Sequence, residues 1–375
     1  MKINYSLAGM GGIARVHLMG LRNIPLMGLQ LGADINLTGL LTTHIKENRK
    51  WAHGIGFENV VGTMEDLVKI PDLDVIDICT PNYLHKEQIM AVIEAKKHVY
   101  CEKPLALNKD QAIEIMDKLE ENYVHNQMGF VLRFLPAVMR ARAIIKSNIL
   151  GKIYAIRGEL YHSSYLNPQK KLTWRLNRAK SGGGALADLG SHMIDLVHFL
   201  LGEIETVQAW TDTIVTQRST DSGELRDVDV DDWALLMVKL KNGAKGTIEA
   251  SRVAVGNEGT RIEIYGEKAS IYIDPDNTYF PRVIDNRSKE IDGIDQLIDH
   301  EEINELLKIF PTPKLSQGWM VDIHAASLGC FLKTVMTNNK LSFAPDFVEG
   351  YKTQVVVDCA YRSSKENGLP VNIDY

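Results

Sequence analysis

The sequence predicts an α/β protein of two domains, with a parallel sheet covered by helices over residues 1–127 and an α+β fold over residues 128–375. In the first third, short apolar strands alternate with helical segments, which is typical of a parallel sheet buried on both faces. Later in the chain, Asn242-Gly243 separates two β-rich segments, and this two-residue hairpin signal indicates antiparallel neighbours. The C-terminal domain is therefore expected to hold a large, mostly antiparallel open sheet.

The individual elements follow from local patterns. In the N-terminal domain, β-prone runs predict strands at residues 2–8, 36–42, 75–79 and 98–101, and helices are expected at residues 15–21 and 64–68. In the C-terminal domain, β-rich runs predict strands at residues 152–161, 206–215, 233–241, 245–253, 261–265 and 270–273. Helices are expected again at residues 321–337 and 347–366.

The first strand leads into a glycine-rich turn and then a helix. Gly9, Gly11 and Ala14 have the spacing of a dinucleotide-binding fingerprint. The first glycine makes the tight turn, the second lets the backbone approach a pyrophosphate, and the small third residue permits close packing of helix on strand. The free N–H groups of the helix then bind phosphate oxygens. We interpret this turn as the cofactor site of a Rossmann domain, formed by Gly9, Met10, Gly11, Gly12, Ile13 and Ala14.

Composition and charge exclude several classes of protein. The formal net charge of −6 argues against a nucleic-acid partner or an anionic membrane surface. Four cysteines without CxxC spacing indicate neither a disulfide framework nor a zinc knuckle, so we expect a reducing cytoplasm. No apolar stretch reaches the length of a membrane span.

Two further segments carry residues suited to proton transfer. Lys103, in Glu102-Lys103-Pro104, follows a strand end, where ligands of doubly wound sheets bind. Its ammonium group could stabilise a developing negative charge on a substrate oxygen, although a surface lysine is the plainer alternative. Asp188 and His192 are four residues apart and share one helical face, after glycines that permit close approach of the backbone to a cofactor.

His192 is the best candidate for a general base, because an imidazole with a pKa near about 6.5 accepts a proton close to neutral pH. Asp188 could orient the substrate and tune this transfer. The alternatives are a helix-capping Asp188 and a packed His192.

These motifs make the chain resemble the glucose-fructose oxidoreductase, inositol dehydrogenase and MocA (Gfo/Idh/MocA) family. The matching stretches are the turn at 9–14, Cys79-Thr80-Pro81-Asn82-Tyr83-Leu84-His85, Cys101-Glu102-Lys103-Pro104-Leu105-Ala106, and residues 182–202 with Asp188, His192 and Asp195. The resemblance implies a Rossmann domain and a substrate domain whose large sheet often forms dimers or tetramers. It also implies hydride transfer without a metal, with sugars, inositols and related polyols as typical substrates.

The remaining site residues are placed around this chemistry. For the cofactor, the loop after the third predicted strand offers Thr80, Pro81, Asn82 and His85, and the Lys103 turn offers Glu102 and Lys103. Ordinary turn chemistry is the alternative for that loop. Glu102 is expected to contact the cofactor ribose, with capping of its own loop as the alternative. For the substrate, the candidates are Trp174 as an apolar wall, Arg175 as a hydroxyl-binding fork, Arg133, Lys103, Asp188 and His192, with Arg178 as a further candidate.

The end of the second strand bears on the choice of cofactor. A carboxylate there normally holds the adenosine ribose of NAD, but this strand ends in Thr42, Thr43 and His44, and Asp34 precedes it. NADP is therefore slightly favoured over NAD, with Thr43, His44, Lys46 or Arg49 to bind a 2′-phosphate. The alternative is an NAD site that uses Thr42 or the backbone.

A metal site is the sharper rival for the Asp188 segment. Asp188, His192, Asp195 and His198 have helical spacing, and the first three cluster on one face. His198 turns away from that face, so we expect no metal and interpret Asp195 as a residue that orients the helix.

The sequence thus predicts an NAD(P)-dependent oxidoreductase that transfers a hydride between a sugar, inositol or polyol carbinol and nicotinamide, as a homodimer or homotetramer through the C-terminal sheet. Two alternatives stay open: an NAD-dependent glycosidase that uses transient oxidation, and a non-catalytic sugar or cofactor sensor of the same fold. The intact Lys103, Asp188 and His192 favour an enzyme.

Overall fold

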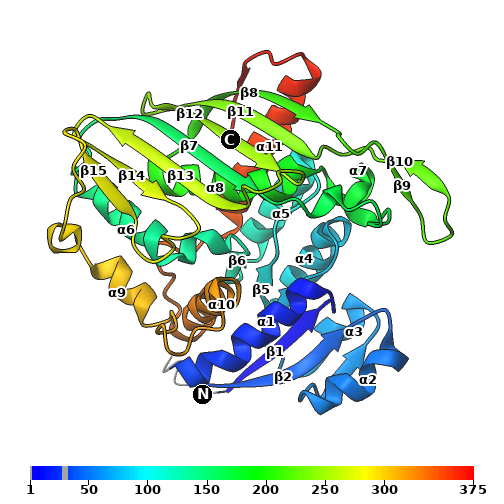
Figure 1. The fold of residues 1–375 in the computed structure, drawn as a ribbon. Coiled ribbons are helices and arrows are strands. Elements are labelled where there is room, and N and C mark those ends of the chain that lie inside the picture. Colours follow the sequence, from blue (N-terminus) through cyan, green and yellow to red (C-terminus); the bar gives the residue numbers. More distant parts are fainter. Residues whose placement is uncertain (1, 28–32) are drawn as a thin grey trace. The chain divides into compact units, whose positions relative to one another are not determined.

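The computed structural model of the protein describes residues 2–27 and 33–375. The chain divides into two compact units (Figure 1). The first unit comprises Met1–Ala106, Asp110–Val131 and Leu306–Tyr351, and the second comprises Leu107–Lys109, Leu132–Glu305 and Lys352–Tyr375. Each unit is described by itself below.

The first unit contains a six-stranded sheet whose strands are all parallel. Its strands are β1 (Lys2–Ala8), β2 (Asp34–Leu41), β3 (Asn59–Val61), β4 (Val75–Ile78), β5 (His98–Cys101) and β6 (Asn126–Met128). Their order, β3-β2-β1-β4-β5-β6, reverses direction between β1 and β4, and ligands of such sheets bind at the carboxyl ends of the strands at that point.

Helices connect these strands. They are α1 (Gly12–Asn23), α2 (Ile45–Gly54), α3 (Met64–Val68), α4 (His85–Glu94) and α5 (Lys109–Glu121). All four residues of β4 are buried, which agrees with the mostly apolar sequence of this strand. A core of apolar side chains from β4, β5, α4 and α5 fills one face of the sheet.

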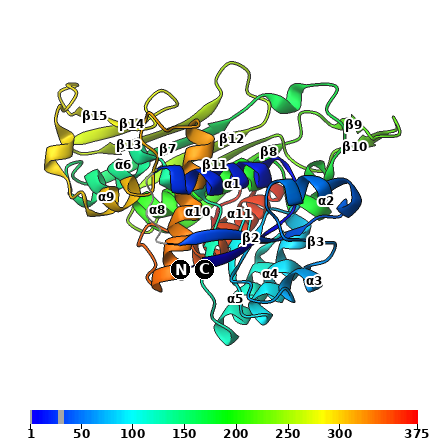
Figure 2. The same cartoon turned by 90° about the horizontal axis from the view of Figure 1, so that it is seen from below.

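The first unit also contains a segment from near the C-terminus, and this differs from the single boundary expected at residue 127. Helix α10 (Trp319–Thr337) packs against α1 (Figure 2), where a Cβ on Gly20 would lie 3.1 Å from the backbone of Ala325. The side chain of Gln127 donates to Ser327 Oγ at 2.9 Å, and Tyr100 Oη shares a 2.9 Å hydrogen bond with the same oxygen. Close packing and buried hydrogen bonds, rather than chain order, assign α10 to the first unit.

The second unit is built on an eight-stranded mixed sheet in the order β15-β14-β13-β7-β12-β11-β8-β16. Its strands are β7 (Ile153–Tyr161), β8 (Ile204–Asp212), β11 (Trp233–Leu240), β12 (Lys245–Ser251), β13 (Gly259–Gly266), β14 (Ala269–Ile273), β15 (Arg282–Asp285) and β16 (Val371–Asn372). Neighbours are antiparallel except β7 and β12, which are parallel. Two short strands, β9 (Gln217–Ser219) and β10 (Leu225–Asp227), form a separate hairpin.

Helices pack on one face of this sheet. The helical segments are α6 (Pro136–Lys146), α7 (Arg178–Ser181), a π-helical turn η6 (Leu186–Gly190), α8 (Ser191–Leu201), α9 (Glu301–Leu307) and α11 (Phe347–Lys365). Helices α6 and α8 contact the sheet directly (Figure 1). On β8 and β11, buried residues alternate with more exposed ones, and Trp210 and Met237 are exposed. This alternation is typical of a sheet with one covered face.

Most predicted elements lie within a few residues of those observed, and the differences are local. The strand expected at residues 206–215 ends at Asp212, and Val215 instead donates its N–H to the Asp232 side chain at 2.8 Å. Strands β3, β6, β9, β10, β15 and β16 were not predicted, because runs of two to four residues carry little periodic signal. In the described part of the chain, no helix is long and apolar enough to span a membrane.

Candidate active site

The glycine turn joins β1 to α1, and glycine is needed for different reasons at positions 9 and 11. Gly9 has φ of 105°, and a Cβ there would lie 2.7 Å from the carbonyl oxygen of Cys79, so the fold itself requires glycine. Gly11 caps α1, and a Cβ on it would meet no protein atom within 4 Å. The protein alone therefore does not demand glycine at position 11, whereas a pyrophosphate bound against the first amides of α1 would.

At the end of β2, no carboxylate stands where a ribose-binding acid is usual. Thr42 is buried, and its Oγ1 accepts the His44 N–H at 3.2 Å and the Asn48 side-chain N–H at 3.0 Å. Thr43 and His44 are exposed, and Asp34 begins β2, at the opposite end of the strand. Asn48, which the sequence did not single out, thus fixes the Thr42 hydroxyl.

The loop after β4 differs from its expected role at two positions. Thr80 Oγ1 donates to Gln88 at 2.6 Å and is buried, and His85 is fully buried. The His85 ring contacts two backbone carbonyls, with Nδ1 at 2.7 Å from Pro104 O and Nε2 at 3.0 Å from Thr80 O. The His85 ring therefore ties the β4 loop to the Lys103 turn, and its contact with a cofactor stays a prediction.

Lys103 lies in the turn after β5 and is partly buried, and its peptide bond to Pro104 is cis. Glu102 is buried. Its Oε2 accepts the Lys103 N–H at 3.3 Å, and its Oε1 lies 3.2 Å from His17 Nε2. Both oxygens therefore contact protein atoms in a buried polar network at the Lys103 backbone, and the contact of Glu102 with a cofactor ribose stays a prediction.

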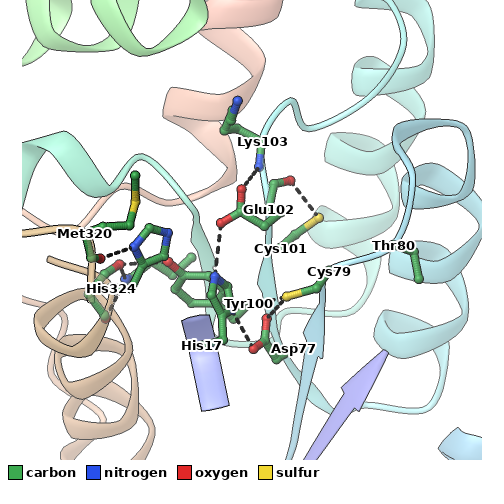
Figure 3. A network of polar contacts seen from close by, with 12 residues as sticks. His17, Asp77, Cys79, Thr80, Tyr100, Cys101, Glu102, Lys103, Met320 and His324 are labelled. Atoms are coloured by element: carbon green, nitrogen blue, oxygen red, sulfur yellow. Dashed lines mark hydrogen bonds and ion pairs between the residues drawn. The ribbon is translucent and has the colours of Figure 1, made fainter. Parts of the chain in front are cut away.

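Figure 3 shows this network beneath Lys103. His17 of α1 is fully buried between two carboxylates, with Nδ1 at 2.8 Å from Asp77 Oδ2 and Nε2 facing Glu102. Tyr5 Oη donates to the same Asp77 oxygen at 2.5 Å, and Cys79 Sγ lies 3.2 Å from His17 Nδ1. Sequence reasoning missed His17 and Asp77, because a histidine on a helix and one polar residue on an apolar strand are weak signals.

Burial and the charges of neighbouring side chains shift the pKa values of this network in opposite directions. Burial alone would lower the pKa of His17, but Asp77 and Cys79 raise it well above its usual value of 6.5. Burial would raise the pKa of Glu102, but the hydrogen bond and charge of His17 lower it to about 2. His324 of α10, whose ring centroid is 5.2 Å from that of His17, has its pKa lowered to about 4 by burial and by the His17 charge.

Two groups of side chains in the described residues have donor atoms close enough together for a metal ion. They are His17 with Glu102 and His324, and His17 with Asp77 and Cys79. In both groups a His17 ring nitrogen already lies at hydrogen-bond distance from a carboxylate oxygen. Protons on the two ring nitrogens would therefore satisfy these oxygens in place of a metal ion.

In the second unit, the three glycines before Asp188 serve packing, which corrects the expectation that they admit a cofactor. Gly182 has φ of 79°, and a Cβ there would lie 2.7 Å from Leu107 O. Any Cβ on Gly183 would collide with the Tyr361 hydroxyl, and one on Gly184 with the backbone of Asp231. The glycines let the chain pass directly over these two residues.

Asp231 then anchors the start of the π-helical turn that carries Asp188. Its carboxylate accepts the N–H groups of Gly184 at 2.9 Å and Leu186 at 2.7 Å, and Tyr361 Oη donates to it at 2.6 Å. Negative charge at a helix start is stabilising, and π-turns occur frequently at functional sites. Asp231 and Tyr361 come from distant parts of the sequence, so the motif around Asp188 could not reveal them.

Asp188 has a buried partner that the sequence also did not reveal. Arg252, directly after β12, donates from its NH2 group to Asp188 Oδ2 at 3.0 Å, with its side chain 1% exposed and that of Asp188 30% exposed. The guanidinium also lies over the Tyr165 ring at 4.6 Å. Asp188 is therefore held as an oriented carboxylate rather than as a simple helix cap, and His192 lies partly buried one turn later, in α8.

Arg133, which the sequence predicts as a substrate-binding residue, pairs with a buried carboxylate. Its guanidinium makes a two-point hydrogen bond to Asp195, at 2.8 Å and 2.5 Å, and both side chains are buried. It is thus a structural ion pair, and Asp195 orients α8 through it. His198 Nε2 lies 2.9 Å from Tyr375 Oη, so Asp195 and His198 of the rival metal set both contact other side chains of the protein.

The remaining substrate candidates lie on the segment before the glycines. Trp174 is partly buried and Arg175 is exposed, with its guanidinium 4.3 Å from the Trp174 ring centre. Arg178 instead covers the Tyr361 ring at 4.2 Å. Trp174 and Arg175 thus form an apolar surface beside an available cation, while Arg178 packs against the residue that supports Asp231.

Comparison with known proteins adds to this geometry. A family model described as an oxidoreductase family with an NAD-binding Rossmann fold matches residues 3–130, and the GFO/IDH/MocA C-terminal domain matches residues 138–272. The levoglucosan dehydrogenase of Pseudarthrobacter phenanthrenivorans is 28% identical over an alignment of 391 positions that covers 98% of each chain. The glucose-6-phosphate 3-dehydrogenase of Bacillus subtilis is 29% identical over an alignment of 378 positions that covers 98% of this chain and 97% of the relative.

A solved structure of a levoglucosan dehydrogenase in complex with NADH and levoglucosan is also similar, with a TM-score of 0.89 and 26% identity over 100% of both chains. The two family models together span well over half of the sequence, in the order expected from the motifs. The chain therefore belongs to the Gfo/Idh/MocA family of oxidoreductases, and its first unit carries the NAD-binding Rossmann fold of that family.

Proposed function

We propose that the protein is an NAD-dependent dehydrogenase that oxidises a carbinol of a sugar, inositol or related polyol. The observation that carries the proposal is the position of Lys103 at the carboxyl end of β5, on the same sheet edge as the glycine turn after β1. Ligands of doubly wound sheets bind at this edge. This shared edge supports a role for the Lys103 ammonium group beside a bound dinucleotide.

NAD fits the residues of the first unit. The amides at the start of α1 and the unobstructed face of Gly11 suit a pyrophosphate, and the exposed Thr43 and His44 stand at the end of β2. Bound NAD would supply a hydride acceptor. The NADH-containing relative supports NAD, and a preference for NADP rests only on the missing carboxylate after β2.

Each proposed catalytic residue has one task. His192 accepts the proton of the substrate hydroxyl, because a neutral imidazole is a suitable base near neutral pH. Lys103 donates a hydrogen bond to the substrate oxygen and stabilises the charge that develops there. Asp188 accepts a hydrogen bond from a substrate hydroxyl and orients it, and Arg252 keeps this carboxylate in place.

The substrate class follows from the second unit and from the relatives. Trp174 offers a ring face and Arg175 a guanidinium, which suit the apolar face and the hydroxyl groups of a sugar ring. Relatives named for levoglucosan and glucose 6-phosphate support a pyranose substrate. We therefore propose a pyranose or cyclic polyol rather than a linear alcohol.

The test is turnover of a panel that contains levoglucosan, glucose, glucose 6-phosphate and myo-inositol, each with NAD and with NADP. Accumulation of reduced cofactor with at least one sugar supports the dehydrogenase. Sugar conversion without net reduced cofactor would favour redox-assisted hydrolysis, and cofactor binding without conversion of any panel member would favour a sensor.

We also propose that the second unit mediates self-association and that the enzyme works in the cytoplasm. The exposed Trp210 and Met237 on the outer face of the eight-stranded sheet support the first point, and four free cysteines support the second. Sedimentation of the protein and of a Trp210→Lys, Met237→Lys variant tests self-association. A wild-type monomer would refute it.

A further inference from the structure

The buried network of the first unit connects the two segments that the proposed function uses. His17 lies in α1, which starts directly after the glycine turn. Glu102 follows the last residue of β5 and directly precedes Lys103. The His17 ring spans the gap between them, with Nε2 at 3.2 Å from Glu102 Oε1 and Nδ1 at 2.8 Å from Asp77 Oδ2 (Figure 3). One side chain therefore links the helix of the cofactor turn to the Lys103 turn.

The geometry favours an imidazolium at His17. A carboxylate oxygen only accepts hydrogen bonds, so both ring nitrogens must donate if both contacts are attractive. A neutral ring would place one nitrogen lone pair against a carboxylate oxygen in a fully buried site, where an unmade hydrogen bond is costly. The raised pKa of His17, caused chiefly by Asp77 and Cys79 against the effect of burial, agrees with this charge state.

The other titratable groups around the ring are compatible with a cation. Tyr5 and Cys79 both donate to Asp77, at 2.5 Å and 3.4 Å, and the Tyr100 ring stands edge-on to His17 at 5.4 Å. His324, from α10, donates its Nδ1–H to Met320 O at 2.6 Å, and burial lowers its pKa to about 4. The cluster thus holds one cation between two carboxylates, with a neutral second histidine beside it.

Glu102 is held from a second side as well. A Cβ on Gly129 would lie 2.5 Å from Glu102 Oε1, so only glycine leaves room for the carboxylate in its present position. The other oxygen, Oε2, accepts the backbone N–H of Lys103. This carboxylate therefore contacts the backbone at the start of the Lys103 turn.

We propose that His17 is a positioning residue, whose ring fixes the Glu102 carboxylate and through it the Lys103 turn, and so links this turn to the helix that follows the cofactor turn. This inference rests on the proposed role of Lys103. It assigns to His17 no contact with substrate or cofactor.

Two variants disturb the bridge in different ways. His17→Gln keeps side-chain N–H donors but removes the positive charge. A glutamine amide also donates from one nitrogen only, so it cannot bridge Asp77 and Glu102 as the two ring nitrogens do. Gly129→Ala leaves every charge in place and displaces Glu102 by steric contact. His98→Gln is the matched control, because His98 begins β5, at the opposite end of the strand from Glu102.

The experiment measures kcat with the sugar that gives turnover in the panel, and the Kd for NAD, in each single variant and in combination with Lys103→Ala. His17→Gln and Gly129→Ala are each expected to lower kcat about 10-fold or more, because small displacements of catalytic groups are costly. Their Kd for NAD should stay within about 3-fold, as positioning residues do not supply binding contacts. In the Lys103→Ala background neither should lower kcat further, because both act through Lys103. His98→Gln should leave kcat unchanged.

An additional loss in the Lys103→Ala background would overturn the inference, as would normal turnover in folded His17→Gln and Gly129→Ala proteins. Normal turnover in Lys103→Ala would instead refute the proposed function itself, so the two failures are distinguishable.

A measurement without substrate keeps the inference falsifiable on its own. In protein labelled with ¹⁵N-histidine, with His17 assigned by loss of its signals in His17→Gln, both ring nitrogens should carry protons at neutral pH. An unprotonated His17 nitrogen would overturn the bridge. Stoichiometric metal in the purified protein that is lost in His17→Gln would also overturn it, because a metal ion would then replace the protons.

Discussion

The Asp188–Arg252 pair should respond asymmetrically to removal of its two partners. Arg252 is 1% exposed and Asp188 30% exposed. Asp188→Ala leaves a buried guanidinium whose Nε and NH1 atoms have no hydrogen-bond partner in the described structure, and removing one partner of a buried pair typically costs about 3–5 kcal/mol. Arg252→Met leaves a carboxylate that water already reaches, so the expected cost is about 1–2 kcal/mol, including the lost contact with the Tyr165 ring.

The double variant Asp188→Ala, Arg252→Met removes both charges, and its cost should be close to that of Arg252→Met alone. The coupling energy then equals the cost of Asp188→Ala, about 3–5 kcal/mol, and a double-mutant cycle measures it. Urea unfolding followed by tryptophan fluorescence is suitable, because Trp174, Trp210 and Trp233 all lie in the second unit. Equal costs for the two single variants, or additive costs in the double variant, would refute the view that Arg252 is a buried cation compensated by Asp188.

The remaining predictions concern the cofactor turn, the choice of cofactor and the pH dependence of stability. Gly11→Val should fold but lose affinity for NAD about 10-fold or more, since its side chain meets open space in the protein yet obstructs a pyrophosphate. Gly54→Val is the control, because a Cβ at Gly54 also meets no protein atom within 4 Å. Unchanged NAD affinity in folded Gly11→Val would count against the turn as the pyrophosphate site. Thr42→Asp should shift the ratio of affinities toward NAD and away from NADP, because a carboxylate binds ribose hydroxyls and repels a 2′-phosphate; an unchanged ratio would show that position 42 does not discriminate. The pKa of His17 is raised in the folded protein, so its stabilising contribution is complete below pH 6.5 and is lost as the pH rises toward that raised value. Between pH 6.5 and 8.5 the unfolding free energy of the wild type should therefore fall more steeply than that of His17→Gln, by up to about 1.4 kcal/mol per pH unit, and parallel curves would contradict a protonated His17.

Features that depend on neighbouring residues could be predicted from the sequence. The strand, glycine turn and helix at the N-terminus are contiguous, and the positions of β4, β5 and α3 follow from short patterns with clear boundaries. The position of Lys103 past a strand end follows in the same way. Such features need only local propensity and the rule that strand ends gather at one sheet edge.

Features that depend on distant residues could not be predicted. Nothing near Asp188 in the sequence points to Arg252 or Asp231, which approach it only through the pairing of the second sheet. The glycines before Asp188 were predictable as a close approach, but the partner proved to be protein rather than cofactor. Arg133 and His85 had residue types suited to ligands, and only the structure shows their burial and their partners within the protein.

The most direct test of the central claim is the transfer of deuterium from sugar to cofactor. The sugar that gives turnover in the panel is prepared with deuterium on its ring carbons and incubated with NAD and the enzyme, and the reduced cofactor is analysed by mass spectrometry. Transfer of one deuterium is expected in the wild type, with turnover reduced by about 10²–10⁴-fold in Lys103→Ala and in His192→Ala. If the sugar is consumed while the cofactor gains no deuterium, or if both variants turn over normally, hydride transfer assisted by these residues is contradicted.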